Sequence, residues 1–371
     1  MERDELAAWL RLTLADGIGN ITVRKLLRTF GPPENVLAQS NSALAQVLGE
    51  RQIAALRRAD EALDAQIERT WAWLAQDEAR GVVALGDAHY PATLLEIEDP
   101  PPLLYWLGSA PVSAVTRERS IAIVGSRNPT PQGLANARHF ARALSGAGLT
   151  IVSGLALGVD GAAHEGALEG APGDLACATV AVLGTGLDRI YPKTHHALAH
   201  RIAERGLLLS EWPIGTPPLA ENFPRRNRII AGLTQGTLVV EAALRSGSLI
   251  TARCAAEQGR EVFAIPGSIH SPQSRGCHAL IKQGARLVED ARDVLEELRL
   301  PAAPAAAHAA PSADAPDSLL ELMGHDPVGF DALQARCGLP TPALQAALLE
   351  HELAGRVARL PGGLLQRVVT A

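Results

Sequence analysis

Residues 121–160 read IAIVGSRNPTPQGLANARHFARALSGAGLTIVSGLALGVD, in which short apolar runs end at glycine-containing turns. Ile121–Val124 is a continuous apolar run that leads into Gly125, and a helical segment separates it from the next run, Leu149–Val152. Short, continuously apolar strands that alternate with helices are typical of a parallel sheet covered on both faces. The stretch therefore predicts the start of an α/β domain.

The same rhythm continues to about residue 290. Helical segments follow most of five further strand candidates, which are Thr179–Leu183, Leu207–Ser210, Thr237–Glu241, Glu261–Ile265 and Ala285–Val288. Parallel strands joined by right-handed helical crossovers form a doubly wound sheet. We therefore expect a Rossmann-like, doubly wound and mostly parallel α/β sheet within residues 81–299.

Residues 1–80 are expected to form a small all-α domain of the helix-hairpin-helix or SAM-like kind. Apolar residues recur three and four positions apart in Glu5–Leu14, in Val23–Phe30 and in the longer stretch Gln52–Leu74, as in amphipathic helices. Gly17-Ile18-Gly19 lies between the first two stretches, and exposed backbone N–H groups at such a hairpin can bind a phosphate. The acidic flanks favour the alternative, an ordinary tight turn.

The end of the chain follows a linker. Residues 300–316 are rich in proline and alanine and show no pattern that predicts packing. Residues 317–371 then predict a winged-helix-like domain with helices at Asp317–Met323, Phe330–Cys337 and Pro342–His351 and strands at Val357–Leu360 and Leu364–Val368. Winged helices bind DNA or protein partners, and the few basic residues here favour partner docking.

The composition favours a folded cytoplasmic protein. Of the 371 residues, 47% are hydrophobic and 20% charged, which is too apolar for a disordered chain. No run of eighteen apolar residues exists, so we expect no membrane span, and the charged start Met1–Glu5 is unlike a signal peptide. The four cysteines are scattered without a C-x-x-C pair, so neither a disulfide framework nor a metal site is expected.

The formal net charge of −6 is unevenly distributed. Residues 1–100 hold ten Lys/Arg against sixteen Asp/Glu and so carry all of it. Residues 221–282 hold eight Lys/Arg against four glutamates, a local charge of +4. Such a basic stretch is typical of an anion-binding surface, and the alternative is a solvated arginine-rich face.

Polar and cationic residues gather at the carboxyl ends of the expected strands, where open parallel sheets bind ligands. Glycine lets a backbone approach a phosphate, serine adds a hydroxyl donor, and arginine and lysine add charge. The residues expected to bind are Gly125, Ser126, Arg127, Ser153, Gly154, Lys193, Arg225, Arg226, Asn227, Arg228, Ser246, Gly247 and Ser248. So many loops at one edge favour a ligand with several phosphates.

Motifs for other chemistries are missing from the sequence. There is no G-x-x-x-x-G-K-[ST] loop, no complete G-x-G-x-x-G and no G-x-S-x-G elbow, so we expect no cofactor and no catalytic triad. His195, His196 and His200 are close in sequence but lack the cysteines or carboxylates of a metal motif. Glu241 at a strand end suits a general base, and a buried structural carboxylate is the alternative.

Aromatic residues refine the class of ligand. Tyr191, Trp212 and Phe223 lie in or beside the expected binding loops. Cationic grooves that bind single-stranded nucleic acid also offer aromatic side chains on which bases stack. The alternative is that these rings cover the edge of the core.

Several of these stretches together resemble the DNA-processing protein A (DprA/Smf) family. The similar segments run in family order and are IAIVGSR (121–127), IVSGLALGVD (151–160), YPK (191–193), FPRRNRIIAG (223–232), VVEA (239–242), SGSLITA (246–252), PGS (266–268) and SRG (274–276). The resemblance covers about residues 80–298. His195 is a departure, because many members have asparagine there, and neutral histidine and asparagine can each donate one hydrogen bond.

The resemblance implies a cytoplasmic protein that is not an enzyme and that binds single-stranded DNA during natural transformation. It further implies protection of incoming DNA, loading of RecA for recombination, and homodimers formed through the Rossmann-like domain. The family's DNA site would fall on Gly125-Ser126-Arg127, on Lys193 and on the turn at 225–228. The rival is a nucleotide-processing hydrolase in which Arg127 binds a phosphate and Glu241 is the acid or base.

Overall fold

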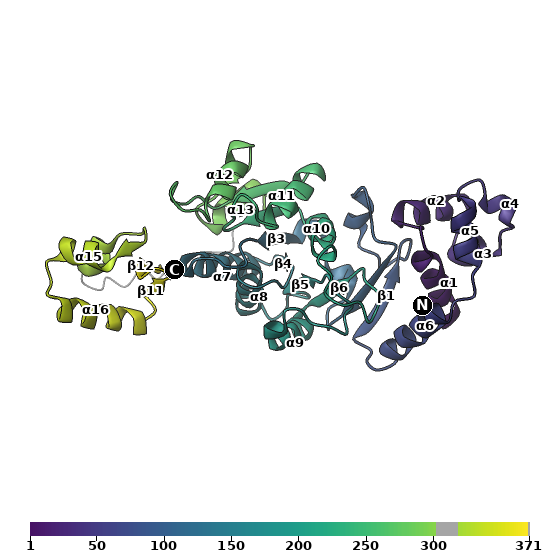
Figure 1. Cartoon of the computed structure of the whole chain (residues 1–371), viewed down its shortest axis with the longest axis horizontal. Coiled ribbons are helices and arrows are strands. Elements are labelled where there is room, and N and C mark those ends of the chain that lie inside the picture. Colours follow the sequence, from purple (N-terminus) through teal and green to yellow (C-terminus); the bar gives the residue numbers. More distant parts are fainter. Residues whose placement is uncertain (302–317, 370–371) are drawn as a thin grey trace.

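The computed structural model describes residues 1–301 and 318–369, and a nine-stranded sheet lies at its centre (Figure 1). The strands are β1 (Arg80–Ala84), β2 (Leu103–Leu107), β3 (Ser120–Val124), β4 (Thr150–Ser153), β5 (Thr179–Val182), β6 (Leu207–Ser210), β7 (Gly236–Val239), β8 (Glu261–Ala264) and β9 (Arg286–Leu287). Their spatial order is β1-β2-β6-β5-β4-β3-β7-β8-β9. The pairs β1·β2 and β2·β6 are antiparallel and all others are parallel, which confirms the predicted mostly parallel α/β sheet.

The strand order reverses between β3 and β7. From β3 the chain adds β4, β5 and β6 on one side, and it then returns to place β7, β8 and β9 on the other. Connections that leave in opposite directions open a crevice at the carboxyl ends of the two strands, where doubly wound folds bind their ligands. The fold therefore places Gly125, which follows β3, at this crevice.

Helices cover both faces of the sheet. One face packs against α7 (Pro131–Gly146), α8 (Val159–Gly170), α9 (His196–Arg205) and α13 (Ala291–Glu297). The other packs against α10 (Asn222–Gly232), α11 (Ser248–Glu257) and α12 (Arg275–Lys282). Single 3-10 turns are η1 (Ala92–Glu96), η2 (Val112–Ala114), η3 (Arg117–Arg119) and η4 (Lys193–His195).

Seven strands fall where the sequence predicts them, with ends that differ by at most two residues. The expected run Leu149–Val152 is one residue early, because β4 begins at Thr150 and includes Ser153. The edge strand β1 and its neighbour β2 were not among the predicted strands. Trp106 on β2 lies across Gly81 on β1, where an added Cβ would come within 2.4 Å of the indole Nε1.

The close packing of α7 and α8 depends on two glycines one turn apart. A Cβ at Gly166 would lie 2.2 Å from the carbonyl oxygen of Arg138, and a Cβ at Gly170 would lie 2.1 Å from that of Arg142. Both neighbours are helix backbone, so the helices would have to separate.

We expect Gly166→Ala to lower the free energy of unfolding by about 1–3 kcal/mol, since the overpacking outweighs the gain in helix propensity. Urea unfolding measures the change. Gly173→Ala is the control, because no heavy atom lies within 4 Å of a Cβ there. Equal stability of the two variants would contradict this account of the α7–α8 contact.

Helix α8 also carries a fully buried histidine. His164 Nδ1 lies 2.7 Å from Thr179 Oγ1, and that hydroxyl donates its own hydrogen to the carbonyl oxygen of Ile151. Nδ1 is therefore the protonated nitrogen of a neutral ring. Burial, with smaller effects from His195 and Arg226, lowers the pKa of His164 to about 3.

This histidine should make the fold sensitive to acid. The unfolded chain takes up a proton near pH 6.5 and the native chain does not, so the His164 contribution is complete above pH 6.5 and decreases as pH falls toward 3. Between pH 7 and pH 5 the expected loss is about 2 kcal/mol. Urea unfolding of wild type and His164→Gln at both pH values isolates this contribution, and an identical pH dependence in the two proteins would refute it.

The helical region at the start of the chain packs beside β1 and β2. It consists of α1 (Arg3–Leu14), α2 (Asn20–Phe30), α3 (Pro33–Ala38), α4 (Asn41–Leu44), α5 (Glu50–Arg57) and α6 (Glu61–Leu74), as expected for an all-α region. The prediction of one long helical stretch over Gln52–Leu74 was wrong. Arg58 is extended, and Asp60 begins a new helix by accepting a hydrogen bond from the Ala62 amide.

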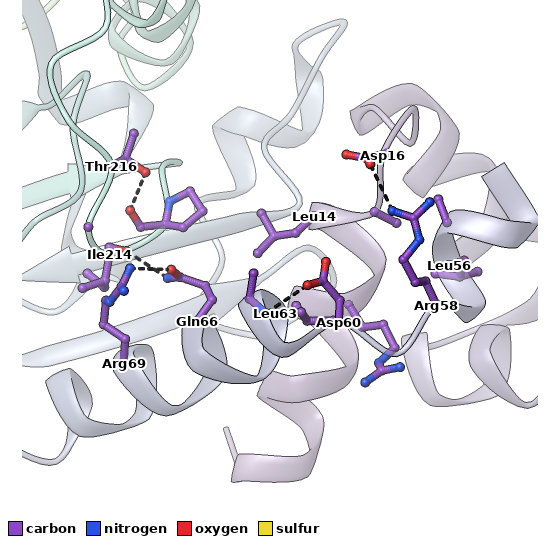
Figure 2. Close-up of a pocket in the computed structure, with 16 residues that line it drawn as sticks. Leu14, Asp16, Leu56, Arg58, Asp60, Leu63, Gln66, Arg69, Ile214 and Thr216 are labelled. Atoms are coloured by element: carbon purple, nitrogen blue, oxygen red, sulfur yellow. Dashed lines mark hydrogen bonds and ion pairs between the residues drawn. The ribbon is translucent and has the colours of Figure 1, made fainter. Parts of the chain in front are cut away.

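A pocket of about 390 Å³ separates this region from the loop that follows β6 (Figure 2). Gln66 Nε2 on α6 donates to the carbonyl oxygen of Ile214 at its wall. Arg69 donates to Gln66 Oε1 on the same side. The Gln66 hydrogen bond thus connects the helical region to the loop after β6 at this wall.

The C-terminal part forms a small separate core. Its elements are α14 (Ser318–Met323), β10 (Val328–Gly329), α15 (Phe330–Cys337), α16 (Thr341–Leu353), β11 (Val357–Leu360) and β12 (Leu364–Arg367), with the strand order β10-β12-β11. Leu333, Leu344 and Leu348 are buried at its centre. These elements confirm the predicted helices and hairpin. Asp317 and the expected linker from residue 302 onward lie outside the described residues.

Candidate nucleic-acid interface

Segments that follow six strands, β3 to β8, line one groove of about 680 Å³ at the carboxyl edge of the sheet. We call it the rim groove. It lies at the reversal between β3 and β7, and eight of the thirteen predicted residues line it, namely Gly125, Ser126, Arg127, Arg226, Asn227, Ser246, Gly247 and Ser248. Ser153, Gly154, Lys193, Arg225 and Arg228 are not among its lining residues.

The loop after β3 provides an exposed cation. Ser126 is buried, and its Oγ accepts a hydrogen bond from the Asn128 amide, which shapes the turn. Gly125 has no room for a side chain, because a Cβ would lie 2.7 Å from Val159. The Arg127 side chain is exposed, and its Cζ lies 5.8 Å from the centroid of the Phe223 ring. An exposed guanidinium thus lies over an aromatic face.

Two aromatic rings meet at the same edge. Tyr191 is 48% exposed, and its ring centroid lies 5.5 Å from that of the half-buried Phe223. Phe223 packs on Gly184, where a Cβ would come within 2.9 Å of the ring. Phe223 therefore packs against Gly184 and also lines the groove.

Arg226, which the sequence predicts to bind, lines the rim groove with a side chain that is almost fully buried. Its guanidinium donates to the carbonyl oxygens of Gly154 and Val182. It also donates to Asn227 Oδ1 and lies 4.0 Å from the Asp160 carboxylate. Burial lowers the pKa of Arg226 to about 10 and raises that of Asp160. Arg226 thus connects α10 to the loop after β4 and to the end of β5.

Ser153 and Gly154 also support the groove from below. Ser153 is fully buried, and its Oγ donates to the carbonyl oxygen of Ile123. A Cβ at Gly154 would lie 2.2 Å from Arg226, so glycine is required for the arginine to reach the backbone. Both residues position the neighbouring loops.

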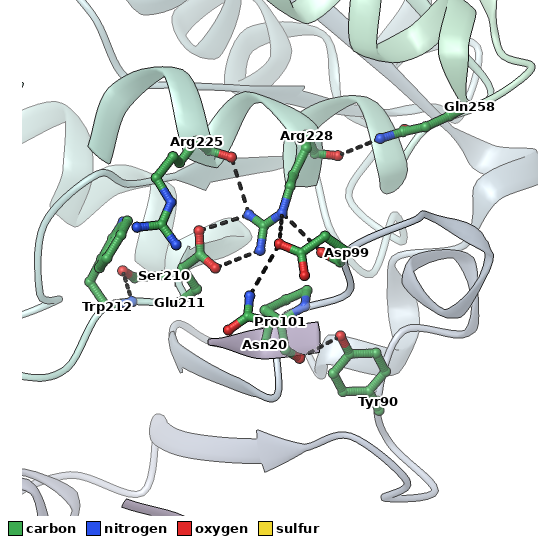
Figure 3. A network of polar contacts seen from close by, with 10 residues as sticks. All are labelled: Asn20, Tyr90, Asp99, Pro101, Ser210, Glu211, Trp212, Arg225, Arg228 and Gln258. Carbon is green, nitrogen blue, oxygen red and sulfur yellow. Dashed lines mark hydrogen bonds and ion pairs between the residues drawn. The ribbon is translucent and has the colours of Figure 1, made fainter. Parts of the chain in front are cut away.

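The Arg228 guanidinium is likewise bound to other residues of this chain (Figure 3). Its two Nη atoms donate to the two Glu211 carboxylate oxygens at 2.7 and 2.6 Å. Its Nε donates to Asp99, whose carboxylate also accepts from Asn20 Nδ2 at the start of α2. Burial lowers the pKa of Arg228, but the hydrogen bonds and charges of Glu211 and Asp99 raise it above the ordinary arginine value. Arg228 therefore connects α10 to the N-terminal helices.

Lys193 begins η4 and is exposed next to Tyr191. The same turn is held by His195, whose Nδ1 lies 3.0 Å from the carbonyl oxygen of Leu155. The carbonyl can only accept, so the ring donates from Nδ1, as an asparagine amide would. At this position, histidine and asparagine can therefore each donate one hydrogen bond to a carbonyl oxygen.

The loop after β7 adds hydroxyl groups and a second exposed cation. Ser246 Oγ and Ser248 Oγ lie 2.7 Å apart, and Asn227 Nδ2 donates to the carbonyl oxygen of Gly247. Arg245 is exposed and lines the groove, although it was absent from the predicted site. Its position directly before Ser246, in the loop that follows β7, was the available signal.

Glu241 is bound at the start of α7, outside the lining of the rim groove. Its two carboxylate oxygens accept hydrogen bonds from the amide and the hydroxyl of Thr130, the residue that caps α7. A Cβ at Gly133 would lie 2.5 Å from the Glu241 carboxyl carbon. Burial raises the pKa of Glu241. This arrangement favours the structural reading of Glu241 over the general base.

Two further observations concern residues 1–301 and 318–369. Within these ranges no group of three His, Cys, Asp or Glu side chains is placed to bind a metal ion, and the rings of His196 and His200 lie 4.6 Å apart without such a third group. No helix in the same ranges has the length and apolarity needed to cross a membrane.

Comparison with known proteins identifies two family matches. Residues 81–299 match the family described as DNA recombination-mediator protein A, and residues 302–363 match the DprA winged helix domain. Protein Smf of Escherichia coli is 44% identical over 312 residues, which are 81% of this chain and 80% of that protein. DNA processing protein DprA of Streptococcus pneumoniae is 47% identical over 211 residues, 57% of this chain and 72% of that protein.

Two solved structures of DNA processing protein A are similar to this chain. The X-ray structure of DNA processing protein A from S. pneumoniae superimposes with a TM-score of 0.67 and 36% identity, covering 80% of this chain and 98% of that one. A structure of DNA processing protein A from Helicobacter pylori has a TM-score of 0.52 and 31% identity, covering 59% and 95%. That H. pylori structure is described as giving insight into a single-stranded DNA binding mode.

Proposed function

Because the chain belongs to the DNA recombination-mediator protein A family, we propose that it binds single-stranded DNA in the rim groove. In this role it protects incoming DNA in the cytoplasm during natural transformation and helps to load RecA on it, without catalysing a reaction. The protein works as a homodimer formed through the Rossmann-like domain. These finer steps rest on the family resemblance.

The observation that carries the proposal is the combination of exposed cations and aromatic faces at one sheet edge. Arg127 and Arg245 line the rim groove and are exposed, and Phe223 and Tyr191 lie between the loops. Cationic grooves that offer aromatic faces bind single strands with little dependence on sequence. Several phosphates of one strand fit such an edge better than a single nucleotide does.

Phosphate contacts and base stacking should make binding sensitive to salt and selective for single strands. Bases in a duplex are stacked on each other and are not free to lie on Phe223 or Tyr191. Phosphate neutralisation makes affinity fall steeply with salt concentration.

The test is fluorescence anisotropy with a labelled single strand and the matching duplex, titrated at several salt concentrations. We expect salt-dependent binding of the single strand and weaker binding of the duplex. Absence of single-strand binding at low salt by the folded protein would refute the proposal. Equal affinity for both forms would refute the stacking component.

A further inference from the structure

Helix α10 presents two different surfaces next to the rim groove. Phe223, Arg226, Asn227 and Ile230 recur at helical spacing and line the groove. Arg225 and Arg228 are one turn apart on another side of the helix, beside Trp212 and Glu211 (Figure 3). A DNA strand that leaves the rim groove over the first turn of α10 would contact this second surface.

Arg225 and Trp212 form a pair on that surface. The Arg225 side chain is exposed, and its Cζ lies 4.9 Å from the centroid of the half-buried Trp212 ring. Within residues 1–301 and 318–369 its guanidinium lies in no ion pair, whereas that of Arg228 is paired with two carboxylates. The positive charge of Arg225 is therefore available to contact an anion, and its guanidinium lies over the Trp212 indole.

The acidic residue beside this pair, Glu211, does not repel an anionic DNA strand. Glu211 precedes Trp212, its side chain is only 7% exposed, and both its carboxylate oxygens accept hydrogen bonds from Arg228. The Arg228 contact thus neutralises the carboxylate that would otherwise repel a phosphate or attract Arg225.

We propose that single-stranded DNA continues from the rim groove across the first turn of α10 and stacks a nucleobase on the Arg225–Trp212 pair. The inference rests on the proposed function and adds a second contact region outside the groove. A planar guanidinium supported by an aromatic ring stacks on any base and also attracts the adjacent phosphate. The sequence predicts Arg225 as a phosphate ligand, and in this proposal it contributes mainly by stacking its planar guanidinium on a base.

Oligonucleotides of two lengths distinguish binding in the rim groove from binding at the Arg225–Trp212 pair. Labelled oligothymidylates of about 5 nucleotides should fill the groove alone, and those of about 20 should reach both regions, given typical sites of ~4–16 nucleotides. Anisotropy titrations at one salt concentration compare wild type with Arg225→Lys, which keeps the charge and loses the plane. Trp212→Leu removes the ring. Arg201→Ala is the control, since Arg201 is an exposed arginine on α9 outside the groove lining.

We expect both site variants to bind the short oligonucleotide as wild type does and the long one about five- to tenfold more weakly. Thermal unfolding monitors the folding of Trp212→Leu, and the exposed Arg225→Lys supplies the result if that variant is unstable. Wild-type affinity of Arg225→Lys for both lengths would overturn the inference, as would an equal loss at both lengths. Absence of binding by wild type itself would instead overturn the proposed function and this extension with it.

Discussion

Replacing Arg127 with alanine should weaken single-strand binding about tenfold at moderate salt and leave the fold intact. Arg127 is exposed at the β3–β7 reversal, and its contact in the free protein is with the Phe223 ring. A charge-assisted contact to a phosphate contributes about 1.5 kcal/mol or more, which corresponds to about tenfold in affinity. Each phosphate contact on a single strand also adds about 0.7 to the salt slope.

The measurement is therefore a plot of log affinity against log salt concentration for wild type and Arg127→Ala. The variant should show a slope shallower by about 0.7, with an unfolding free energy within about 0.5 kcal/mol of wild type. Lys282→Ala removes an exposed cation at the end of α12, away from the lining of the rim groove, and should change neither quantity. A wild-type slope in Arg127→Ala would mean that DNA lies elsewhere on the molecule.

The position of the groove could be predicted because it follows from topology. Ile121–Val124 and Thr237–Glu241 read as buried strands, and parallel strands place their carboxyl ends at one edge. The residues that follow the two strands must then lie at the same edge, and Arg127 and Ser246 both line the groove there. No knowledge of side-chain orientation is needed for this step.

Which cations are free could not be predicted, because it depends on partners that are distant in sequence. Arg225, Arg226 and Arg228 are alike in the sequence, yet Arg226 lies against Asp160 and Arg228 binds Glu211 and Asp99. Helical geometry turns neighbouring residues in different directions, and the tertiary fold decides what each one meets. Of these three arginines, Arg225 has an exposed side chain, whereas the guanidinium groups of Arg226 and Arg228 are bound within the protein.

The break in the expected helical stretch Gln52–Leu74 has a local cause that periodicity does not reveal. Gln52–Leu74 keeps a helical apolar pattern through Arg58, although the backbone leaves the helix there and restarts after the Asp60 cap. Capping depends on a backbone conformation that the apolar pattern does not encode.

Replacing Arg226 with methionine should have the largest effect on stability, a loss of about 3–5 kcal/mol. Methionine fills similar space but has no donors. The carbonyl oxygens of Gly154 and Val182 would lose a partner, and the buried Asp160 carboxylate would lose its neighbouring positive charge. An uncompensated buried charge is far more costly than the ion pair is favourable. Because these groups form the floor of the rim groove, single-strand affinity should fall as well.

Urea unfolding of matched variants tests this role. Arg225→Met makes the same chemical change one residue earlier at an exposed position, so its unfolding free energy should stay within about 0.5 kcal/mol of wild type. Asp160→Asn removes the stranded charge, so the double variant with Arg226→Met should lose less than the two single losses added together. Strict additivity would show that Asp160 and Arg226 act independently. The arginine would then support the groove through its carbonyl contacts alone.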